Sequence, residues 1–233
     1  MVDLDTWPWP ENTLLARLSP RSRRELLGLG HERECKPGTL LMRQGDPGNT
    51  VFVLRSRDTR VSACVKITAA AGTLFAIRVS GDVIGELGAL TPNSVRSATA
   101  TVCTATIAHC IPGNMFLTFL NEHPDGWQTL CRTIADRLAW SDQRRLDFGG
   151  GPVRRCLARL LMEFGESYGR PVEYGLEITV RLSYEELGNL IGAGEDAVGL
   201  AMKKLQEADL VCLRNRHIVV RDLEGLRKYS GLV

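Results

Sequence analysis

Residues 81–90 read GDVIGELGAL, and residues 96–99 read RSAT. The first stretch passes through a turn and then begins a short helix, whose unpaired N–H groups and positive dipole end suit a phosphate. An arginine fork at Arg96 and a hydroxyl at Ser97 would add charge-assisted hydrogen bonds to the same oxygens, and Glu86 would accept one from a ribose hydroxyl. A glycine alone also serves a tight turn, and a single arginine is commonly a surface residue. The combination predicts a phosphate-binding cassette.

The sequence around this cassette is typical of a β-domain. Residues 35–110 are rich in Val, Ile, Thr and Ala, and turn signals at 37–38, 45–49 and 81–82 separate short apolar runs. Many short strands of this kind close into a sandwich or a barrel.

After Pro112-Gly113 the pattern changes to a helical period. It predicts one long amphipathic helix over residues 124–147. The apolar stripe of this helix either covers the β-domain or pairs with the same stripe of a second copy, and a long helix beside a hinge favours the dimer. The residues that need an apolar partner are Trp127, Leu130, Ile134 and Leu138.

The cassette, at this spacing, resembles the phosphate-binding cassette of cyclic-nucleotide-binding domains in the Crp/Fnr family of bacterial transcription regulators. Residues 36–54 (KPGTLLMRQGDPGNTVFVL) resemble the first strands and turn of that domain, so the resemblance covers most of residues 12–110. One departure is Arg57-Asp58, where the family usually has a glycine in the turn.

The resemblance implies a ligand and the residues that hold it. Cassette residues would line the ribose and clasp the cyclic phosphate, and in nucleotide-sensing members polar residues of the long helix reach the base from both subunits. Cyclic AMP is the ligand we expect, with cyclic GMP as the alternative. The residues at these positions are Gly85, Glu86, Leu87, Arg96 and Ser97 in the cassette, and Ser141 and Asp142 on the helix.

The seven cysteines are scattered without a C-x-x-C pair, which argues against a disulfide framework and against a zinc site. Some family members sense oxygen through an amino-terminal cysteine cluster that holds iron and sulfur, but Cys35 stands alone near the amino terminus. Other members bind haem, whereas the four histidines are better explained as structural residues. We therefore expect a nucleotide and no metal.

Residues 183–220 predict a winged helix-turn-helix. Ser183 and Glu186 form a capping box for a helix over 184–191, and a glycine turn then leads into a second helix over 195–208. Residues 211–220 (VCLRNRHIVV) predict a wing of two short strands with a basic tip. Upstream, the pattern predicts a helix over 152–168 and a strand through Ile178, Val180 and Leu182. This module also resembles the Crp/Fnr carboxyl-terminal domain.

The second helix departs from the family at its start. Members that read the familiar palindromic site commonly begin it SRETVGR, but residues 194–200 read GEDAVGL, so both arginines are absent. Glu195 and Asp196 would repel the phosphate backbone or accept a hydrogen bond from cytosine N4. Residues 151–233 hold twelve basic and twelve acidic residues, so no basic excess attracts DNA. The residues expected at DNA are Glu195, Asp196 and Gly199, with Lys203, Lys204, Arg214 and Arg216 on phosphates.

The whole chain therefore predicts an α+β protein with a β-barrel or jelly-roll cyclic-nucleotide-binding domain, a long dimerisation helix and a carboxyl-terminal winged helix-turn-helix. A hinge at Gly149-Gly150-Gly151-Pro152 sets the boundaries, which are residues 1–112, 113–148 and 149–233. The expected partners are double-stranded DNA, a second copy of the chain and RNA polymerase.

No apolar run is long enough to span a membrane, and the acidic, proline-containing start is unlike a secretory leader, so we expect a cytoplasmic protein with no membrane partner. No nucleophile–base pair stands out, so we expect a regulator and not an enzyme. Two alternatives remain open. The protein could act through another protein without sequence-specific DNA binding, or it could bind no ligand and be constitutively active or controlled by redox at a cysteine.

Overall fold

The computed structural model describes residues 7–59, 61–69, 71–91, 93–148 and 152–231. The chain divides into two compact units, an amino-terminal unit that ends at Arg137 and a carboxyl-terminal unit that begins at Leu138. The division falls inside helix α5 (Pro124–Phe148). The three-part division expected from the sequence stays a prediction, and its glycine hinge at 149–151 lies outside the described residues.

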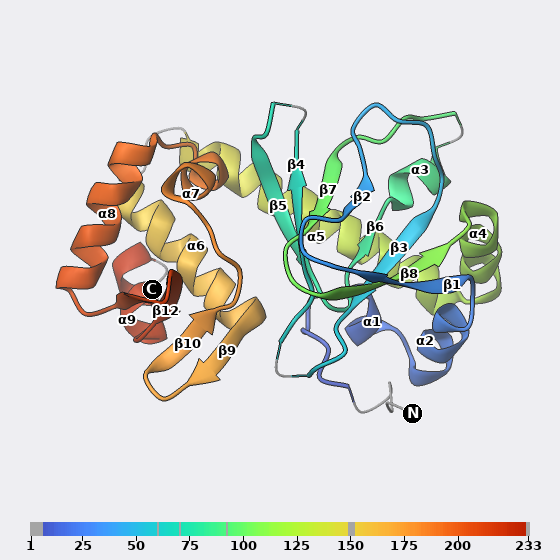
Figure 1. The fold of residues 1–233 in the computed structure, drawn as a ribbon, viewed down its shortest axis with the longest axis horizontal. Helices are drawn as coiled ribbons and strands as arrows, with labels where there is room; N and C mark the ends of the chain where they lie inside the picture. Colours follow the sequence, from blue (N-terminus) through green and yellow to red (C-terminus); the bar gives the residue numbers. More distant parts are fainter. Residues whose placement is uncertain (1–6, 60, 70, 92, 149–151, 232–233) are drawn as a thin grey trace. The chain divides into compact units, whose positions relative to one another are not determined.

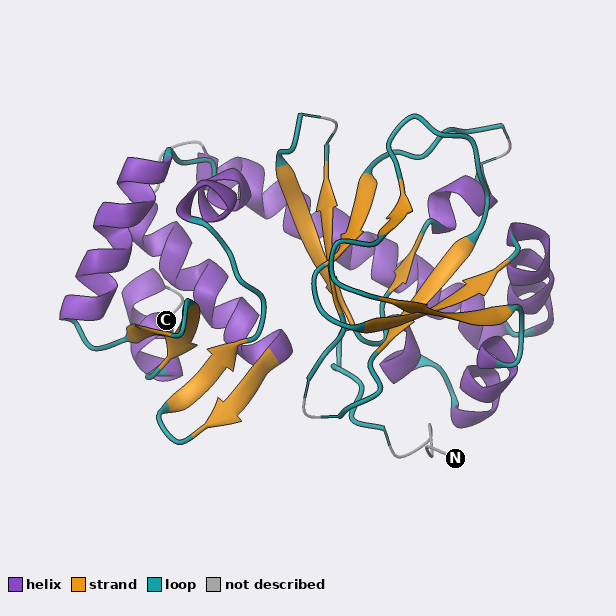
Figure 2. Cartoon of the chain, viewed as in Figure 1, coloured by secondary structure: helices purple, strands orange, loops and turns teal. Residues whose placement is uncertain are grey.

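Two four-stranded antiparallel sheets form the body of the amino-terminal unit (Figures 1 and 2). One sheet has the order β1-β8-β3-β6 and the other β2-β7-β4-β5. A buried apolar cluster draws side chains from strands of both sheets, so the sheets pack face to face as predicted. The strands are β1 (His31–Cys35), β2 (Leu40–Met42), β3 (Val51–Arg55), β4 (Cys64–Thr68), β5 (Leu74–Val79), β6 (Val83–Ile84), β7 (Thr99–Val102) and β8 (Thr106–Ile111).

Strand β3 alternates between two apolar cores. Phe52 and Leu54 face the cluster between the sheets, whereas Val51 and Val53 face a second cluster that the helices supply. This second cluster also contains the amino-terminal Trp7 and Trp9 side chains. The helices of this unit are α1 (Leu14–Arg17), α2 (Pro20–Leu27), α3 (Glu86–Leu90), α4 (Gly113–Glu122) and the first part of α5.

Helix α5 forms where the sequence predicts it. Part of its apolar stripe packs against the core of the same chain. Leu130 is fully buried in the helical core of its own unit, and Trp127 and Ile134 are partly buried against the same core. Leu138 differs, because its side chain is 61% exposed. Leu130 therefore fits the interpretation in which the stripe covers its own domain, and pairing of the stripe with a second copy stays a prediction.

The carboxyl-terminal unit is a helical domain with one sheet of order β11-β12-β10-β9. The predicted strand through Val180 and Leu182 is wrong, because the strand ends at Ile178 and pairs Leu176 with Val220. The partner strand β12 is only four residues long, His217–Val220. Continuing the antiparallel register would place Val180 opposite Arg216, which lies in the hairpin turn and not in the strand. The elements are α6 (Val153–Tyr168), β9 (Gly169–Val172), β10 (Gly175–Ile178), α7 (Tyr184–Ile191), α8 (Glu195–Glu207), β11 (Val211–Arg214), β12 (His217–Val220) and α9 (Leu223–Ser230).

Of the helices in the described ranges, none combines the length and the apolar character that a membrane crossing requires.

Candidate functional site: a nucleotide cassette and a winged helix-turn-helix

The Arg96 side chain lies buried against the turn that begins α3. Its Nη1 donates to the carbonyl oxygen of Gly85 at 3.1 Å, and its Nη2 donates to the carbonyl oxygen of Thr50 at 2.8 Å. Gly85 has φ 79°, a left-handed conformation that favours glycine. A Cβ at Gly85 would lie 2.7 Å from Arg96 Nη1, and a Cβ at Gly88 would lie 3.1 Å from the same atom. The glycine spacing of the cassette therefore makes room for this guanidinium.

The main chain of Arg96 is fixed as well. Its N–H donates to the carbonyl of Asp46, and its carbonyl accepts from the N–H of Gly45, both at 2.9 Å. Burial lowers the pKa of the Arg96 guanidinium, and the nearby Glu86 carboxylate opposes that shift. A guanidinium has five N–H donors, so its two carbonyl bonds do not exhaust its capacity for an anion.

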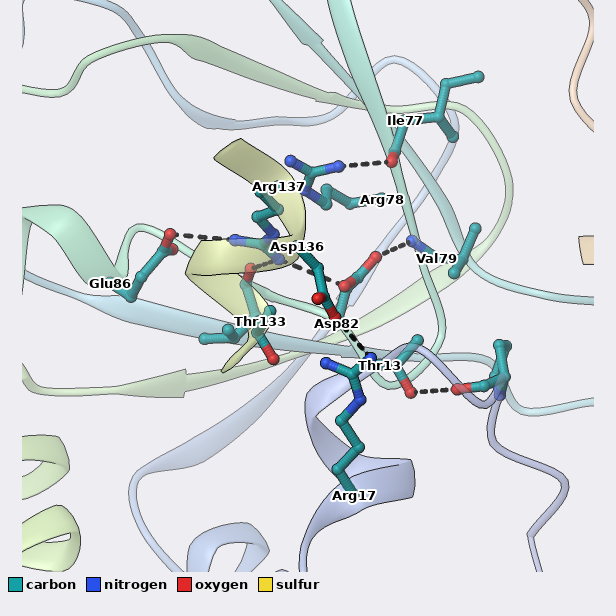
Figure 3. Close-up of polar contacts among 12 residues, drawn as sticks. Thr13, Arg17, Ile77, Arg78, Val79, Asp82, Glu86, Thr133, Asp136 and Arg137 are labelled. Carbon is teal, nitrogen blue, oxygen red and sulfur yellow. Dashed lines mark hydrogen bonds and ion pairs between the residues drawn. The ribbon is translucent and has the colours of Figure 1, made fainter. Parts of the chain in front are cut away.

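The Glu86 carboxylate is held by an arginine from helix α5 (Figure 3). Arg137 Nη1 lies 3.0 Å from Glu86 Oε1, and Arg137 Nη2 lies 3.2 Å from Asp82 Oδ1. Arg137 also donates to the carbonyl of Val83 at 2.7 Å. Asp82 is itself fixed, because its second oxygen accepts from the N–H of Val79 at 3.0 Å. One guanidinium therefore bridges two carboxylates of the cassette.

The preceding residue of α5, Asp136, ties the same helix to α1. Asp136 Oδ2 lies 2.6 Å from Arg17 Nη2 on α1 (Figure 3). Two residues before Arg17, the N–H of Leu15 donates to the carbonyl of Gly81 at 3.0 Å, and Gly81 directly precedes Asp82. The cassette turn and α5 are thus both anchored to α1.

The structure brings together Gly85, Glu86 and Arg96 of the predicted ligand residues. Leu87 points outward at 46% exposure, and Ser97 is exposed directly after Arg96. Ser141 and Asp142 lie on the part of α5 that belongs to the carboxyl-terminal unit. Their contact with a base stays a prediction.

Sequence reasoning missed Arg137. Two signals were available, since Arg137 stands one helical turn before Ser141 and since the cassette holds two carboxylates, Asp82 and Glu86, that need a counter-charge when buried.

The helix-turn-helix forms as predicted. Ser183 and Glu186 make the reciprocal capping box at the start of α7, and Gly192 ends that helix with φ 71°. A Cβ at Gly188 would overlap the backbone carbonyl oxygen of Ala193, so this glycine lets the turn close on the helix. The three residues expected in the shared core are fully buried, namely Leu187, Val198 and Leu205.

The outward face of α8 carries a mixture of charge and apolar surface. Glu195 and Asp196 are exposed in its first turn, and Lys203 and Lys204 are exposed further along. Leu200, between the acids and the lysines, is 63% exposed. Gly199 is only partly exposed, because the Tyr184 ring lies over it. Leu200 was not among the predicted DNA residues.

The wing is a tight hairpin whose tip is two residues long. Asn215 and Arg216 have φ 49° and 64°, as a two-residue hairpin turn of type I′ requires, and Arg214 pairs with His217 in the ladder. The Arg214 guanidinium lies 4.2 Å from the centroid of the Tyr174 ring. This cation–π contact holds an exposed arginine beside the tip.

Family models match both units. The cyclic nucleotide-binding domain matches residues 32–123, and the Crp-like helix-turn-helix domain matches residues 156–229. A CRP-like cAMP-activated global transcriptional regulator from Mycobacterium tuberculosis is 22% identical over 191 residues, which are 82% of this chain and 84% of that protein.

Solved structures agree on the fold. A CRP-family transcriptional regulator from Thermus thermophilus has a TM-score of 0.67 and 16% identity, over 85% of this chain and 96% of the other. The c-di-GMP responsive global regulator CLP of Xanthomonas campestris has a TM-score of 0.66 and 21% identity, over 88% and 100%. Together with the two family matches and the cassette, these findings show that the chain belongs to the Crp/Fnr family of transcription regulators, with a cyclic nucleotide-binding domain and a DNA-binding helix-turn-helix domain.

Proposed function

We propose that the chain is a homodimeric transcription regulator that cyclic AMP controls by binding at the cassette. The observation that carries this proposal is the Arg96 guanidinium, fixed at the start of α3 beside the Glu86 carboxylate. An arginine fork suits a cyclic phosphate, and a carboxylate suits the ribose hydroxyl next to it. Arg137 orients this carboxylate, because its Nη1 lies 3.0 Å from Glu86 Oε1.

The alternative ligands are cyclic GMP and a cyclic dinucleotide. The Mycobacterium tuberculosis relative is described as cAMP-activated, and the Xanthomonas campestris regulator as c-di-GMP responsive. The cassette favours a compact mononucleotide, because one buried arginine and one buried carboxylate match one phosphate and one ribose. Ser141 and Asp142 are the proposed base contacts.

Isothermal titration calorimetry with cyclic AMP, cyclic GMP and c-di-GMP tests the ligand. Removing one partner of a buried charged pair costs about 2–5 kcal/mol, so Arg96→Ala is expected to weaken cyclic AMP binding at least tens of fold. Arg96→Lys keeps the positive charge but loses the planar fork of N–H donors, so its affinity shows how much of the binding depends on charge alone. Arg33→Ala, on an exposed arginine of β1, is the control. Equal affinity of the wild type and Arg96→Ala would reject the site.

The proposed dimer uses an exposed face of α5. Cys131 and Ala135 are exposed and Leu138 follows three residues later, so these residues share one helical face. The small side chains at 131 and 135 would let two such helices approach closely.

The proposed DNA contact is made by α8 and the wing, with RNA polymerase as the further partner expected at a promoter. One observation favours a second candidate, in which the carboxyl-terminal domain binds a protein. Glu195 and Asp196 put two exposed acids at the start of α8, where a phosphate backbone would repel them. A mobility shift on the chain's own upstream DNA, with and without cyclic AMP, distinguishes the two.

A further inference from the structure

Leu200 stands on the solvent face of α8 although the helix buries its apolar residues elsewhere. Val198, Ala201, Met202 and Leu205 are all buried, so they form the inner face of the helix. Leu200 is 63% exposed on the other side. A single exposed leucine is common on a protein surface, so the charged residues that flank Leu200 on the same helix decide which partner it fits.

The neighbours of Leu200 along the helix indicate what that partner is. Asp196 lies one turn before it, and Lys203 and Lys204 lie one turn after it, all exposed. A surface that fits this order offers a hydrogen-bond donor, then a small apolar group, then negative charge. The major groove of duplex DNA offers all three, as the cytosine amino group, the thymine C5-methyl group and the phosphates.

The spacing agrees with this order. Four residues of helix rise about 6 Å, and successive bases of one strand are about 3.4 Å apart, so the two side chains would meet bases one or two steps apart. We propose that Leu200 is a specificity-determining residue that contacts the methyl group of a thymine, one or two base pairs from a cytosine whose amino group donates to Asp196. This inference rests on the proposed DNA contact of α8 and names the base that the contact selects.

The test uses a substitution in the DNA that removes only the methyl group. Random duplexes are selected on the full-length protein in the presence and in the absence of cyclic AMP, and each thymine of the enriched duplex is then replaced by deoxyuridine. Burying one methyl group is worth about 0.8 kcal/mol, so one deoxyuridine in one half-site is expected to weaken wild-type binding about fourfold.

Leu200→Ala should bind the thymine and deoxyuridine duplexes equally, because the side chain that senses the methyl group is gone. Leu40→Ala, on an exposed leucine of β2, is the matched control and should keep the fourfold difference. Circular dichroism checks that Leu200→Ala keeps its helix content, which its exposed position predicts.

The outcomes separate this inference from the proposed function. If no sequence is enriched, DNA recognition fails, and this inference fails with it. If a sequence is enriched but no deoxyuridine weakens wild-type binding, or if Leu200→Ala retains the difference, the thymine contact is overturned while DNA recognition stands.

Discussion

Arg137 of α5 and Glu86 of α3, fifty-one residues apart in sequence, form an ion pair at 3.0 Å, and their side chains are only 20% and 8% exposed. The same guanidinium holds Asp82. Two largely buried carboxylates repel each other, and a cation between them offsets this repulsion. Arg137 supplies that cation, so it stabilises the cassette as well as attaching α5 to it.

Arg137→Met should therefore destabilise the protein, because it leaves Glu86 and Asp82 buried without their counter-charge. Breaking a buried ion pair from one side costs on the order of 3 kcal/mol. Urea unfolding followed by circular dichroism measures the change. Arg132→Met, on an exposed arginine of the same helix, should change the free energy of unfolding by less than about 0.5 kcal/mol. Equal losses in the two variants would contradict the role of the pair.

His109 on β8 should make stability fall in mildly acidic solution. Burial lowers the pKa of its ring, while a hydrogen bond to the Leu29 carbonyl and the charge of Glu32 raise it, and Arg55 and His31 lower it further. The ring is therefore protonated more readily in the unfolded chain than in the folded one. The contribution of the neutral ring to the free energy of unfolding is complete above about pH 6.5. It is lost as the pH falls through the lowered pKa that His109 has in the folded protein.

The measurement for His109 is the free energy of unfolding between pH 5 and pH 7. One proton changes it by at most about 1.4 kcal/mol per pH unit. His109→Gln keeps an N–H donor for Leu29 but has no titrating ring, so its profile should be flatter in this window. A variant as steep as the wild type would show that other groups carry the dependence.

Gly188→Ala should disrupt the helix-turn-helix, because its Cβ would overlap the Ala193 carbonyl. Overpacking of this kind costs about 1–3 kcal/mol. Gly194→Ala is the matched control, since a Cβ there meets nothing within 4 Å and its φ is −70°. It should cost less than about 1 kcal/mol, as a loss of helix capping. Thermal unfolding compares the two, and similar losses would argue against a close approach at Gly188.

Leu138→Glu should weaken the proposed dimer, because it puts a charge at the exposed apolar position of α5. Leu138→Met conserves the volume and apolar character and should leave the dimer intact. Multi-angle light scattering at micromolar concentration gives the mass of each. A wild-type mass of one chain would overturn the dimer, and with it the paired half-sites that such regulators bind.

The elements that sequence reasoning places correctly are those with local signals. Ser183 and Glu186 cap α7 from three residues apart, and the glycines of the cassette mark a turn that only glycine adopts easily. Trp127 and Ile134 show the limit, because helical period reveals an apolar stripe but not which surface covers it. The two buried carboxylates of the cassette indicate that a counter-charge is needed, but that Arg137 supplies it is set by how α5 crosses the cassette.

The carbonyls of Gly85 and Thr50 order the Arg96 side chain within the folded protein itself. Restricting the rotamers of a free arginine side chain costs up to about 2 kcal/mol of conformational entropy. This entropy is lost when the protein folds, so the Arg96 guanidinium is already ordered when an anion binds at the cassette. The affinity of the site for a nucleotide then depends on the freedom that the nucleotide loses, and a ligand locked in its bound shape by its own ring gains the most from a receptor of this kind.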